Sequence, residues 1–246
     1  MTEEIGKRFM ELSRYENMED SQQKQGIVPQ PPLELPYLGS GPCLDLPRPE
    51  EIHLPSLDLL DLINRRKTLR KYSPKPLSLT ELSFLLWTTQ GVKQITKRPV
   101  TFRTVPSAGA RHAFETYILV NRVDGLEKGL YRYLAIRHQI ARVEATETIT
   151  EQVSQACLEQ DQIIQAAVTL IWVAVPQRMV WRYGERGYRY LHLDAGHVCQ
   201  NLYLAAEAIE CGVCAIAAFD DVELNRVMSL DGEEQFVIYL GTVGKK

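Results

Sequence analysis

The chain has 246 residues, of which 24% are charged and 45% hydrophobic, and its formal net charge is −3. This is the composition of a globular protein with a core of its own, and it excludes the basic surface that binds nucleic acid or a membrane. The longest apolar run, 166–175, is far shorter than the ~20 residues of a membrane span. The start of the chain lacks the apolar segment of a secretion signal, and five cysteines are too few for a disulfide scaffold. We therefore expect a cytoplasmic protein with one main domain.

The first 52 residues differ from the rest, and we predict an N-terminal arm over 1–52 followed by a single domain over 53–246. Residues 19–26 are polar and aperiodic, and most of the 13 prolines fall between Pro29 and Pro55. Proline fixes φ and donates no N–H, so this stretch should be extended and irregular. Its many apolar side chains indicate that it lies over another surface, which can be that of a partner subunit. The alternative is a disordered tail.

Regular structure is expected from Ser56 onward. Ser56 can cap a helix over 57–64, and Ser78 with Glu81 forms a capping box for a helix that ends at Gly91. Further elements follow from apolar periodicity: strands over 115–121, 129–134 and 166–175, and a helix over 148–158.

The strongest helical pattern covers 188–209, and Gly212 is its expected end. A short strand over 213–218, a helix capped by Asp220 and a final strand over 235–243 complete the chain. Because helices and strands mix without a βαβ repeat, the sequence predicts an α+β fold, with helices packed around a mainly antiparallel sheet.

Five of the seven residues from Arg65 to Lys71 are cationic, in a chain of negative net charge. In an extended stretch Arg66, Thr68 and Arg70 point the same way. Guanidinium groups bind phosphate through forked hydrogen bonds, and a neighbouring hydroxyl adds another. The pattern indicates a phosphate clamp, with a solvated basic face as the alternative.

Three other segments can carry chemistry. The run Pro106–His112 contains small residues and a glycine, which let the backbone approach a planar ligand. The run Arg182–Tyr190 is expected to be a flexible loop that suits a substrate wall. Cys211 and Cys214 form a C-x-x-C pair, yet they lie at a helix end and on an apolar strand, so inert buried thiols are favoured over a redox dithiol. A metal site is not expected, because there is no second C-x-x-C and His192 and His197 do not share a helical face.

Taken together in chain order, these motifs resemble the FMN-dependent nitroreductase superfamily. The segments are Arg-Arg-Lys-Thr-Leu-Arg-Lys-Tyr, Pro-Ser-Ala-Gly-Ala-Arg-His, Arg-Tyr-Gly-Glu-Arg-Gly-Tyr-Arg and Ala-Gly-His-Val-Cys-Gln-Asn-Leu. The branch most similar to them is that of the SagB-type dehydrogenases, which oxidise azoline rings in modified peptides. The resemblance covers essentially the whole chain and implies a nitroreductase-like fold in a domain-swapped homodimer, with FMN bound at the subunit interface.

The resemblance also implies roles for individual residues. The phosphate of FMN would be held by the basic loop and by the C-terminus: Arg66, Lys67, Thr68, Arg70 and Lys245. The flavin ring would lie against Pro106, Ser107, Ala108 and Gly109, supplied by the other subunit. The remaining flavin contacts would come from Gln200, Asn201, Ala217, Ala218 and Phe219. The family often has glycines where this chain has Ala217 and Ala218.

Arg182 and Tyr183 are the expected catalytic residues, because a Lys-Tyr pair stands at the matching place in azoline dehydrogenases of this branch. Ring oxidation removes a hydride and a proton, so a base is needed beside the flavin. Arginine stays protonated at any working pH and cannot be that base. We therefore expect Tyr183 to act in turnover and Arg182 to act mainly in substrate affinity.

Three functions remain open at the level of the sequence. The first is a flavin oxidoreductase acting on a peptide azoline or a small molecule. The same fold can instead serve a nitro or quinone reductase that uses NAD(P)H as co-substrate. The third is a flavin-binding partner protein without turnover. None of the three requires nucleic acid, a membrane or a metal.

Overall fold

The structure is a computed structural model that describes residues 4–39, 41–51, 53, 56–144 and 146–246. Residues 1–3, 40 and 52 of the expected arm therefore lie outside the described residues, as does Pro55. Within the described part of the chain, no helix is both long and apolar enough to cross a membrane.

A seven-stranded sheet forms the centre of the molecule, and every neighbouring pair of its strands is antiparallel. In spatial order its strands are β1 (Cys43–Asp45), β6 (Gln139–Glu144), β5 (Gly129–Leu134), β4 (Phe114–Val120), β7 (Val168–Ala174), β9 (Phe236–Lys245) and β8 (Cys211–Ile216). A separate hairpin pairs β2 (Val92–Ile95) with β3 (Thr101–Arg103). The expected α+β class with an antiparallel sheet is confirmed.

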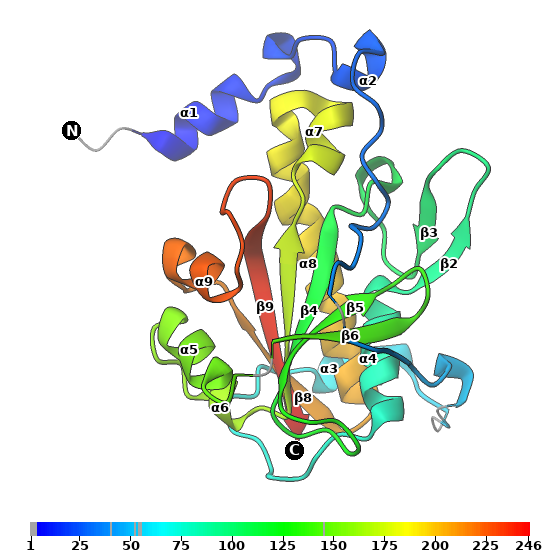
Figure 1. The fold of residues 1–246 in the computed structure, drawn as a ribbon, viewed down its shortest axis with the longest axis vertical. Helices are drawn as coiled ribbons and strands as arrows, with labels where there is room; N and C mark the ends of the chain where they lie inside the picture. The colour runs from blue at the N-terminus through cyan, green and yellow to red at the C-terminus, as the bar shows by residue number, and fades with distance from the viewer. Residues whose placement is uncertain (1–3, 40, 52, 54–55, 145) are drawn as a thin grey trace.

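Helices cover both faces of this sheet (Figure 1). The α-helices are α1 (Ile5–Leu12), α2 (Gln22–Gln25), α3 (Leu59–Arg65), α4 (Leu79–Gln90), α5 (Ile149–Ala156), α6 (Gln162–Gln165), α7 (Gln177–Tyr183), α8 (Gly187–Ala208) and α9 (Asp221–Val227). Short 3₁₀ turns are η1 (Tyr15–Asn17), η2 (Pro49–Glu51), η3 (Ala108–Ala110) and η4 (Gly184–Arg186).

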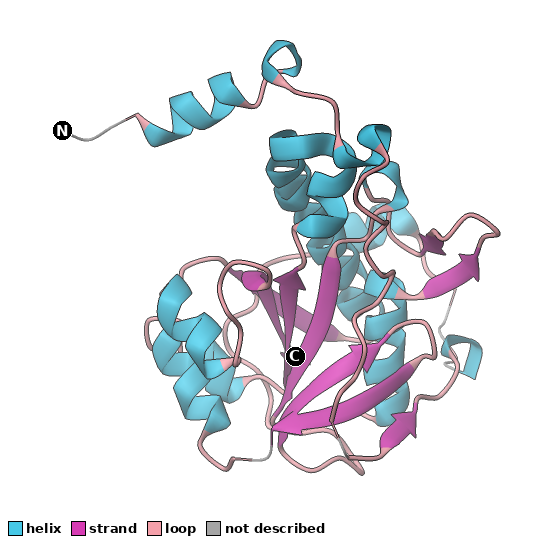
Figure 2. Cartoon of the chain, turned by 45° about the horizontal axis from the view of Figure 1, so that its top comes forward, coloured by secondary structure: helices cyan, strands magenta, loops and turns pink. Residues whose placement is uncertain are grey.

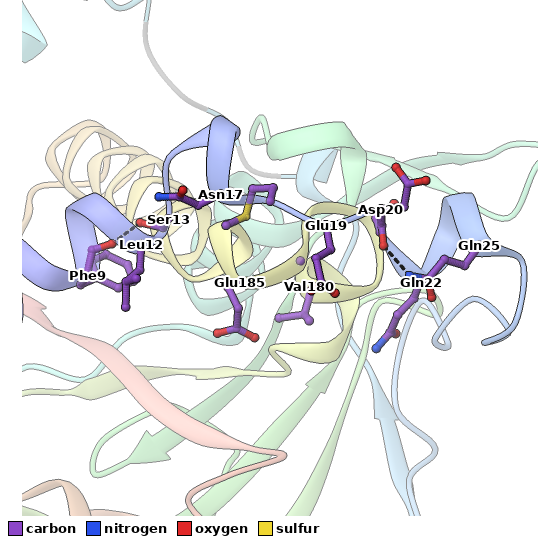
Figure 3. A pocket seen from close by; sticks show the side chains of 13 residues that line it. Phe9, Leu12, Ser13, Asn17, Glu19, Asp20, Gln22, Gln25, Val180 and Glu185 are labelled. Atoms are coloured by element: carbon purple, nitrogen blue, oxygen red, sulfur yellow. Dashed lines mark hydrogen bonds between the residues drawn. The ribbon is translucent and has the colours of Figure 1, made fainter.

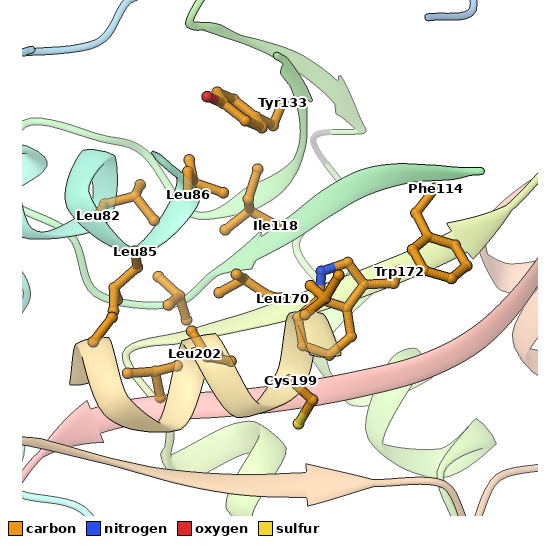
Figure 4. Close-up of a cluster of buried hydrophobic side chains, with 14 of the residues drawn as sticks. Leu82, Leu85, Leu86, Phe114, Ile118, Tyr133, Leu170, Trp172, Cys199 and Leu202 are labelled. Carbon is orange, nitrogen blue, oxygen red and sulfur yellow. The ribbon is translucent and has the colours of Figure 1, made fainter. Parts of the chain in front are cut away.

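Two hydrophobic cores hold these layers together. Because side chains alternate along a strand, Leu170 and Trp172 of β7 join the core under α4 and α8, while Ile171 and Val173 join the core under α5, α6 and α9. Figure 4 shows the first core, in which Ile118 and Leu170 lie between the leucines of α4 and the indole of Trp172. Full burial of one such side chain contributes roughly 1.5–3 kcal/mol, so this core fixes α8 firmly on the sheet.

Most of the predicted elements are present, with shifted ends. The capping box is confirmed: Ser78 accepts from the Glu81 N–H, Glu81 accepts from the Ser78 N–H, and α4 ends before Gly91. The cap predicted at Ser56 is wrong. The carboxylate of Asp58 accepts from the Asp61 N–H instead, so α3 begins two residues later than expected.

The long helix ends within one residue of its predicted range, but Gly212 is not the residue that ends it. The helix α8 stops at Ala208, and Glu210 reverses the chain with a φ of 58°. Gly212 lies inside β8, where the side chain of Leu69 occupies the space that a Cβ would need. The strand β8 begins at Cys211 and ends at Ile216, so it lies two residues earlier than predicted.

The proline-rich part of the arm is extended and lies on its own chain. The carbonyls of Pro32, Leu33 and Pro36 accept hydrogen bonds from Arg178, Arg103 and Arg132. These arginines satisfy carbonyls in a stretch whose prolines cannot pair as a strand. By contrast, α1 stands off the body of the molecule, as Figure 1 and Figure 2 both show, and its apolar side chains are exposed.

Candidate functional site

The basic loop that follows α3 is fastened along the edge of β8. Thr68 forms a parallel bridge with Val213, and the Leu69 N–H donates to the Val213 carbonyl at 2.9 Å. The absent Cβ of Gly212 lets Leu69 pack directly on the strand. The extended backbone expected for this segment is therefore held in place by β8.

Arg66 and Thr68 meet at the ring of Tyr203, on α8. The Arg66 guanidinium carbon lies 5.3 Å from the ring centroid, and the Thr68 hydroxyl is 3.2 Å from the tyrosine oxygen. That oxygen also accepts from the Ala215 N–H at 3.1 Å, so Tyr203 connects the loop, the helix and β8. Sequence reasoning did not single out Tyr203. Its position three residues after Gln200, on the same side of α8, was the available signal.

The positive charges of this loop are not neutralised by the chain itself. Among the described residues, no carboxylate lies within 4 Å of Arg66, Lys67 or Arg70. Lys67 and Arg70 are exposed, and Arg66 is half-buried. We define Arg66, Thr68 and Arg70 as the basic clamp. Its donors fit a phosphate, which accepts forked hydrogen bonds.

Lys245 is not directed at the basic clamp. Its ammonium forms an ion pair with Glu81, the capping residue of α4, and donates to the Ile209 carbonyl at 3.3 Å. The expectation that the C-terminus reaches a phosphate therefore has no support in this arrangement, because the charge of Lys245 is already compensated.

The turn at 106–110, which we call the glycine loop, is fixed by Asp194 of α8. Ala108 N–H donates to one oxygen of that carboxylate at 3.2 Å, and the Ser107 hydroxyl accepts from the His112 N–H at 2.9 Å. The other oxygen of Asp194 is buried without a partner among the described residues, and burial raises the pKa of this carboxyl. An orphaned buried oxygen beside an exposed turn is a feature that a bound polar ligand would satisfy.

Gly109 takes a φ of 55° and lies against the side chains of Arg182 and Tyr183. A Cβ at this position would lie 2.8 Å from Nε of Arg182 and still closer to the hydroxyl of Tyr183. The structure thus brings together the glycine loop and the two residues expected to be catalytic, which are separated by more than 70 positions in the sequence.

Arg182 and Tyr183 are not on a flexible loop, as the sequence suggested. They are the last residues of α7, and Gly184, with a φ of 56°, turns the chain into η4 and α8. At Gly187 the start of α8 packs tightly on α7, since a Cβ there would lie 3.0 Å from the backbone of Met179. The two glycines therefore mark a tight joint between helices, which holds Tyr183 in a T-shaped contact with Tyr190 at 4.8 Å.

Gln200 and Asn201 were also predicted to contact the flavin. Asn201 instead has a structural role, whereas the side chain of Gln200 is free to contact a ligand. The amide nitrogen of Asn201 donates to the Thr88 carbonyl at 2.9 Å, which ties α8 to α4. Gln200 is exposed on α8. After β8, Ala217 and Ala218 are exposed, while Phe219 packs against the core under α5 and α9.

The basic clamp and the glycine loop lie on opposite sides of one exposed stripe of α8. The stripe contains Leu193, Gly196 and Gln200, at spacings of three and four. Because each residue advances 100° around a helix, Tyr203 borders one side of this stripe and Asp194 the other. Within one chain the two groups therefore face away from each other across the helix.

A cavity of about 640 Å³ lies between α1, α2 and the joint that follows α7 (Figure 3). Its walls include Phe9 and Leu12 of α1, Met18, and Val180 and Glu185. None of the predicted site residues lines it.

The C-x-x-C pair is buried on β8, as expected for inert thiols. Burial raises the pKa of Cys211 to about 12, and burial also raises the pKa of Cys214. Thiols that stay protonated are poor nucleophiles, which disfavours a redox dithiol. Within the described residues, no group of three or more His, Cys, Asp or Glu side chains is placed to hold a metal ion.

Comparison with known proteins gives a consistent result. The model of the nitroreductase family matches residues 63–245. The nitroreductase-family protein MJ1384 of Methanocaldococcus jannaschii is 37% identical over 199 residues, covering 80% of this chain and 96% of MJ1384. The trifolitoxin-processing protein TfxB of Rhizobium leguminosarum bv. trifolii is 29% identical over 133 residues, covering 52% of this chain. That match spans only 36% of TfxB.

The crystal structure of a nitroreductase-like protein from Ralstonia eutropha has the same fold. It superposes with a TM-score of 0.68 at 23% identity, covering 89% of this chain and 95% of that one. The match of the family model over most of the chain and the similarity to MJ1384 lead to one conclusion: this chain belongs to the nitroreductase family.

Proposed function

We propose that the protein is an FMN-dependent oxidoreductase that works as a homodimer. The observation that carries this proposal is the basic clamp: Arg66, Thr68 and Arg70 are fastened along β8 with no acidic partner among the described residues. A clamp of this size suits one terminal phosphate. The chain has no Gly-x-Gly-x-x-Gly motif for a pyrophosphate, which favours FMN over FAD.

The arrangement around α8 supports the dimer. The clamp and the glycine loop lie on opposite sides of the exposed stripe, and a Cβ at Gly196 would touch nothing in its own chain. If two copies pack these stripes together about a two-fold axis, the clamp of one subunit faces the glycine loop of the other. Each flavin site would then be completed by Ser107, Ala108 and Gly109 of the partner subunit.

The residues of this chain would divide the work of the reaction. FMN, when bound, accepts or donates a hydride. The clamp would hold its phosphate, and the absent Cβ of Gly109 lets Arg182 and Tyr183 pack directly on the glycine loop. Tyr183, fixed by α7 and by Tyr190, takes or gives the proton at its phenol oxygen. Arg182 keeps its charge and binds substrate.

Two substrate classes have specific support. The similarity to TfxB, a trifolitoxin-processing protein, favours a modified peptide whose azoline ring is oxidised, with oxygen as the final electron acceptor, as in SagB-type dehydrogenases. The longer similarity to MJ1384 favours a nitro or quinone compound with NAD(P)H as the hydride donor. We favour a role in hydride transfer with either class over a flavin-binding protein without turnover, because Tyr183 is positioned beside the glycine loop.

Steady-state kinetics of two variants test this function. With equal FMN content, Tyr183→Phe should lower kcat by roughly 10²-fold, since acid–base groups contribute about that much or more. Arg182→Ala should chiefly raise KM. Tyr117→Phe, which removes a phenol oxygen on β4 outside the proposed site, serves as the control and should behave like the wild type. Wild-type turnover by both site variants would remove Arg182 and Tyr183 from the active site.

A further inference from the structure

Two arginines converge on Gly109, and only one of them was expected to have a role. Nε of Arg111 donates to the Gly109 carbonyl at 3.0 Å. Nε of Arg182 would lie 2.8 Å from a Cβ on the same glycine. The glycine loop therefore brings together two guanidinium groups that come from separate parts of the chain.

The two side chains differ in how firmly they are held. Arg111 is 6% exposed, and its guanidinium carbon lies 5.5 Å from the ring centroid of Trp181. The indole N–H of Trp181 donates to the Val28 carbonyl at 2.8 Å, so the ring beneath Arg111 is itself anchored. Arg182 is exposed, with its guanidinium carbon 5.6 Å from the ring centroid of Tyr183. One charge is thus pre-positioned and the other can adjust to a ligand.

These two charges have no counter-charge in the part of the chain that the structure describes. No carboxylate there lies within 4 Å of either guanidinium, whereas the buried Arg132 and Arg178 share Glu115. Burial lowers the pKa of Arg111, and the positive charge of Arg182 lowers it further. The pair repels itself, and an anion between the two groups would relieve that repulsion.

We propose that Arg111 and Arg182 form an anion-binding subsite beside Tyr183, which takes a carboxylate or phosphate group of the substrate or co-substrate. Guanidinium groups bind both anions through forked, charge-assisted hydrogen bonds. This proposal rests on the proposed function in one respect: it takes the bound anion to be part of a reactant of that oxidoreductase. It narrows the substrate class to molecules that carry an anionic group within reach of Tyr183.

The anion can come from two sources. One is a carboxylate of the molecule that exchanges hydride, and the other is a phosphate of a nicotinamide dinucleotide. Benzoate represents the first and adenosine 2′,5′-bisphosphate the second. Calorimetric titration of each into the full-length protein as isolated gives a Kd that does not depend on turnover.

Three variants complete the experiment. Arg111→Gln and Arg182→Gln each remove one charge of the subsite. Arg137→Gln is the control, because Arg137 is an exposed arginine outside the site, in the turn between β5 and β6. At least one probe should bind the wild type and Arg137→Gln with the same Kd. The same probe should bind each subsite variant about tenfold or more weakly. The probe that binds more tightly identifies the source of the anion.

Failure of both probes to bind the wild type, or an unchanged Kd in both subsite variants, would overturn the proposal. Loss of FMN from Arg111→Gln or Arg182→Gln would overturn it too, because the pair would then hold the cofactor phosphate. Arg182 lies at an exposed helix end, so its variant stays informative if Arg111→Gln fails to fold. A protein that lacks flavin yet binds anions through this pair would contradict the proposed function and leave the subsite standing.

Discussion

Glu115 is a buried carboxylate shared by two buried arginines. Its oxygens accept from Arg132 at 2.9 Å and from Arg178 at 2.5 Å, and one of them also accepts from the Leu35 N–H of the arm. Burial alone would raise the pKa of Glu115, but the two arginines outweigh it and lower that pKa. The carboxylate therefore stays charged and connects the arm to the sheet.

Replacing this carboxylate should strongly destabilise the fold. Glu115→Gln leaves two buried guanidinium groups without a counter-charge, which costs about 3–5 kcal/mol in comparable cases. Chemical denaturation measures this loss, and limited proteolysis should show faster cleavage within residues 27–38. Glu127→Gln is the matched control, because the Glu127 side chain is 80% exposed and its pair with Arg142 should contribute less than about 1 kcal/mol. Equal losses of unfolding free energy in the two variants would show that Glu115 does not act as the buried counter-charge of the two arginines.

His112 should make the stability depend on pH. Burial, followed by the charge of Arg103, lowers the pKa of His112 from 6.5 to about 3. Between these values the unfolded chain binds a proton that the folded chain does not, so the free energy of unfolding falls as the pH falls. The slope is about 1.4 kcal/mol per pH unit.

His112→Asn tests this dependence, since asparagine tolerates the φ of 45° at this position and does not titrate. Denaturation curves between pH 4 and pH 7 should show a shallower slope for the variant than for the wild type. His192→Asn changes an exposed histidine on α8 and should leave the slope unchanged. If His112→Asn retained the wild-type slope, the buried histidine would not be its source.

Single residues of the candidate site were predictable where the signal was local. The alternation of Arg66, Thr68 and Arg70 needs only an extended backbone, which the bridge to Val213 provides. Asp194, Tyr203 and Arg111 could not be assigned, because their roles depend on partners that the fold brings close. The Ala108 N–H, for example, lies 86 positions before the carboxylate that it contacts.

At the scale of elements, capping residues and apolar periodicity predicted most helices, but they did not predict the tight turn between α7 and α8. The capping box at Ser78 is complete within four residues and was predictable. The helix α7 was not predicted, because Gly184 and Gly187 are equally typical of a loop. Only the close approach of α7 to α8 shows why a glycine is needed at 187.

The arm consists of two parts with different attachments. Its proline-rich part is held by buried arginines of its own chain. Its first part is held by η4 and α8: Arg186 of η4 and Arg189 of α8 donate to the carbonyl and hydroxyl of Ser13, at 2.7 and 2.6 Å. Ile5 and Leu12 of α1 remain exposed, at 74% and 55%. We propose that this part of the arm contacts the partner subunit.

Deleting residues 1–19 should weaken the dimer and leave the fold intact, because α2 keeps its cap at Ser21 and the arginine contacts of the proline-rich part are retained. Deleting residues 1–48 should also lower the melting temperature, since it removes the carbonyls that those arginines satisfy. Sedimentation measures the dimer, and calorimetry measures the melting temperature. A shorter variant that dimerises as tightly as the wild type would show that the first part of the arm is not at the interface.

At the scale of the whole molecule, the order of the strands in the sheet could not be predicted from the periodicity of the sequence. The last strand of the chain, β9, lies between β7 and β8, so the core is closed by pairings between distant segments. Periodicity gives the class of fold but contains no signal for such an order. The resemblance of the motifs to a family supplied that information, and the match over residues 63–245 agrees with it.

The central claim is that the basic clamp of this fold binds FMN, and the flavin content of the purified protein tests it most directly. Absorbance and chromatography of the released cofactor should show FMN rather than FAD in the full-length protein. Arg66→Ala and Arg70→Ala should each lower the FMN occupancy about tenfold or more, because each variant loses a charge-assisted hydrogen bond to the phosphate. The control Arg137→Ala should retain the FMN occupancy of the wild type. Full FMN content in both clamp variants, or a wild-type protein that binds no FMN when it is supplied, would contradict the account.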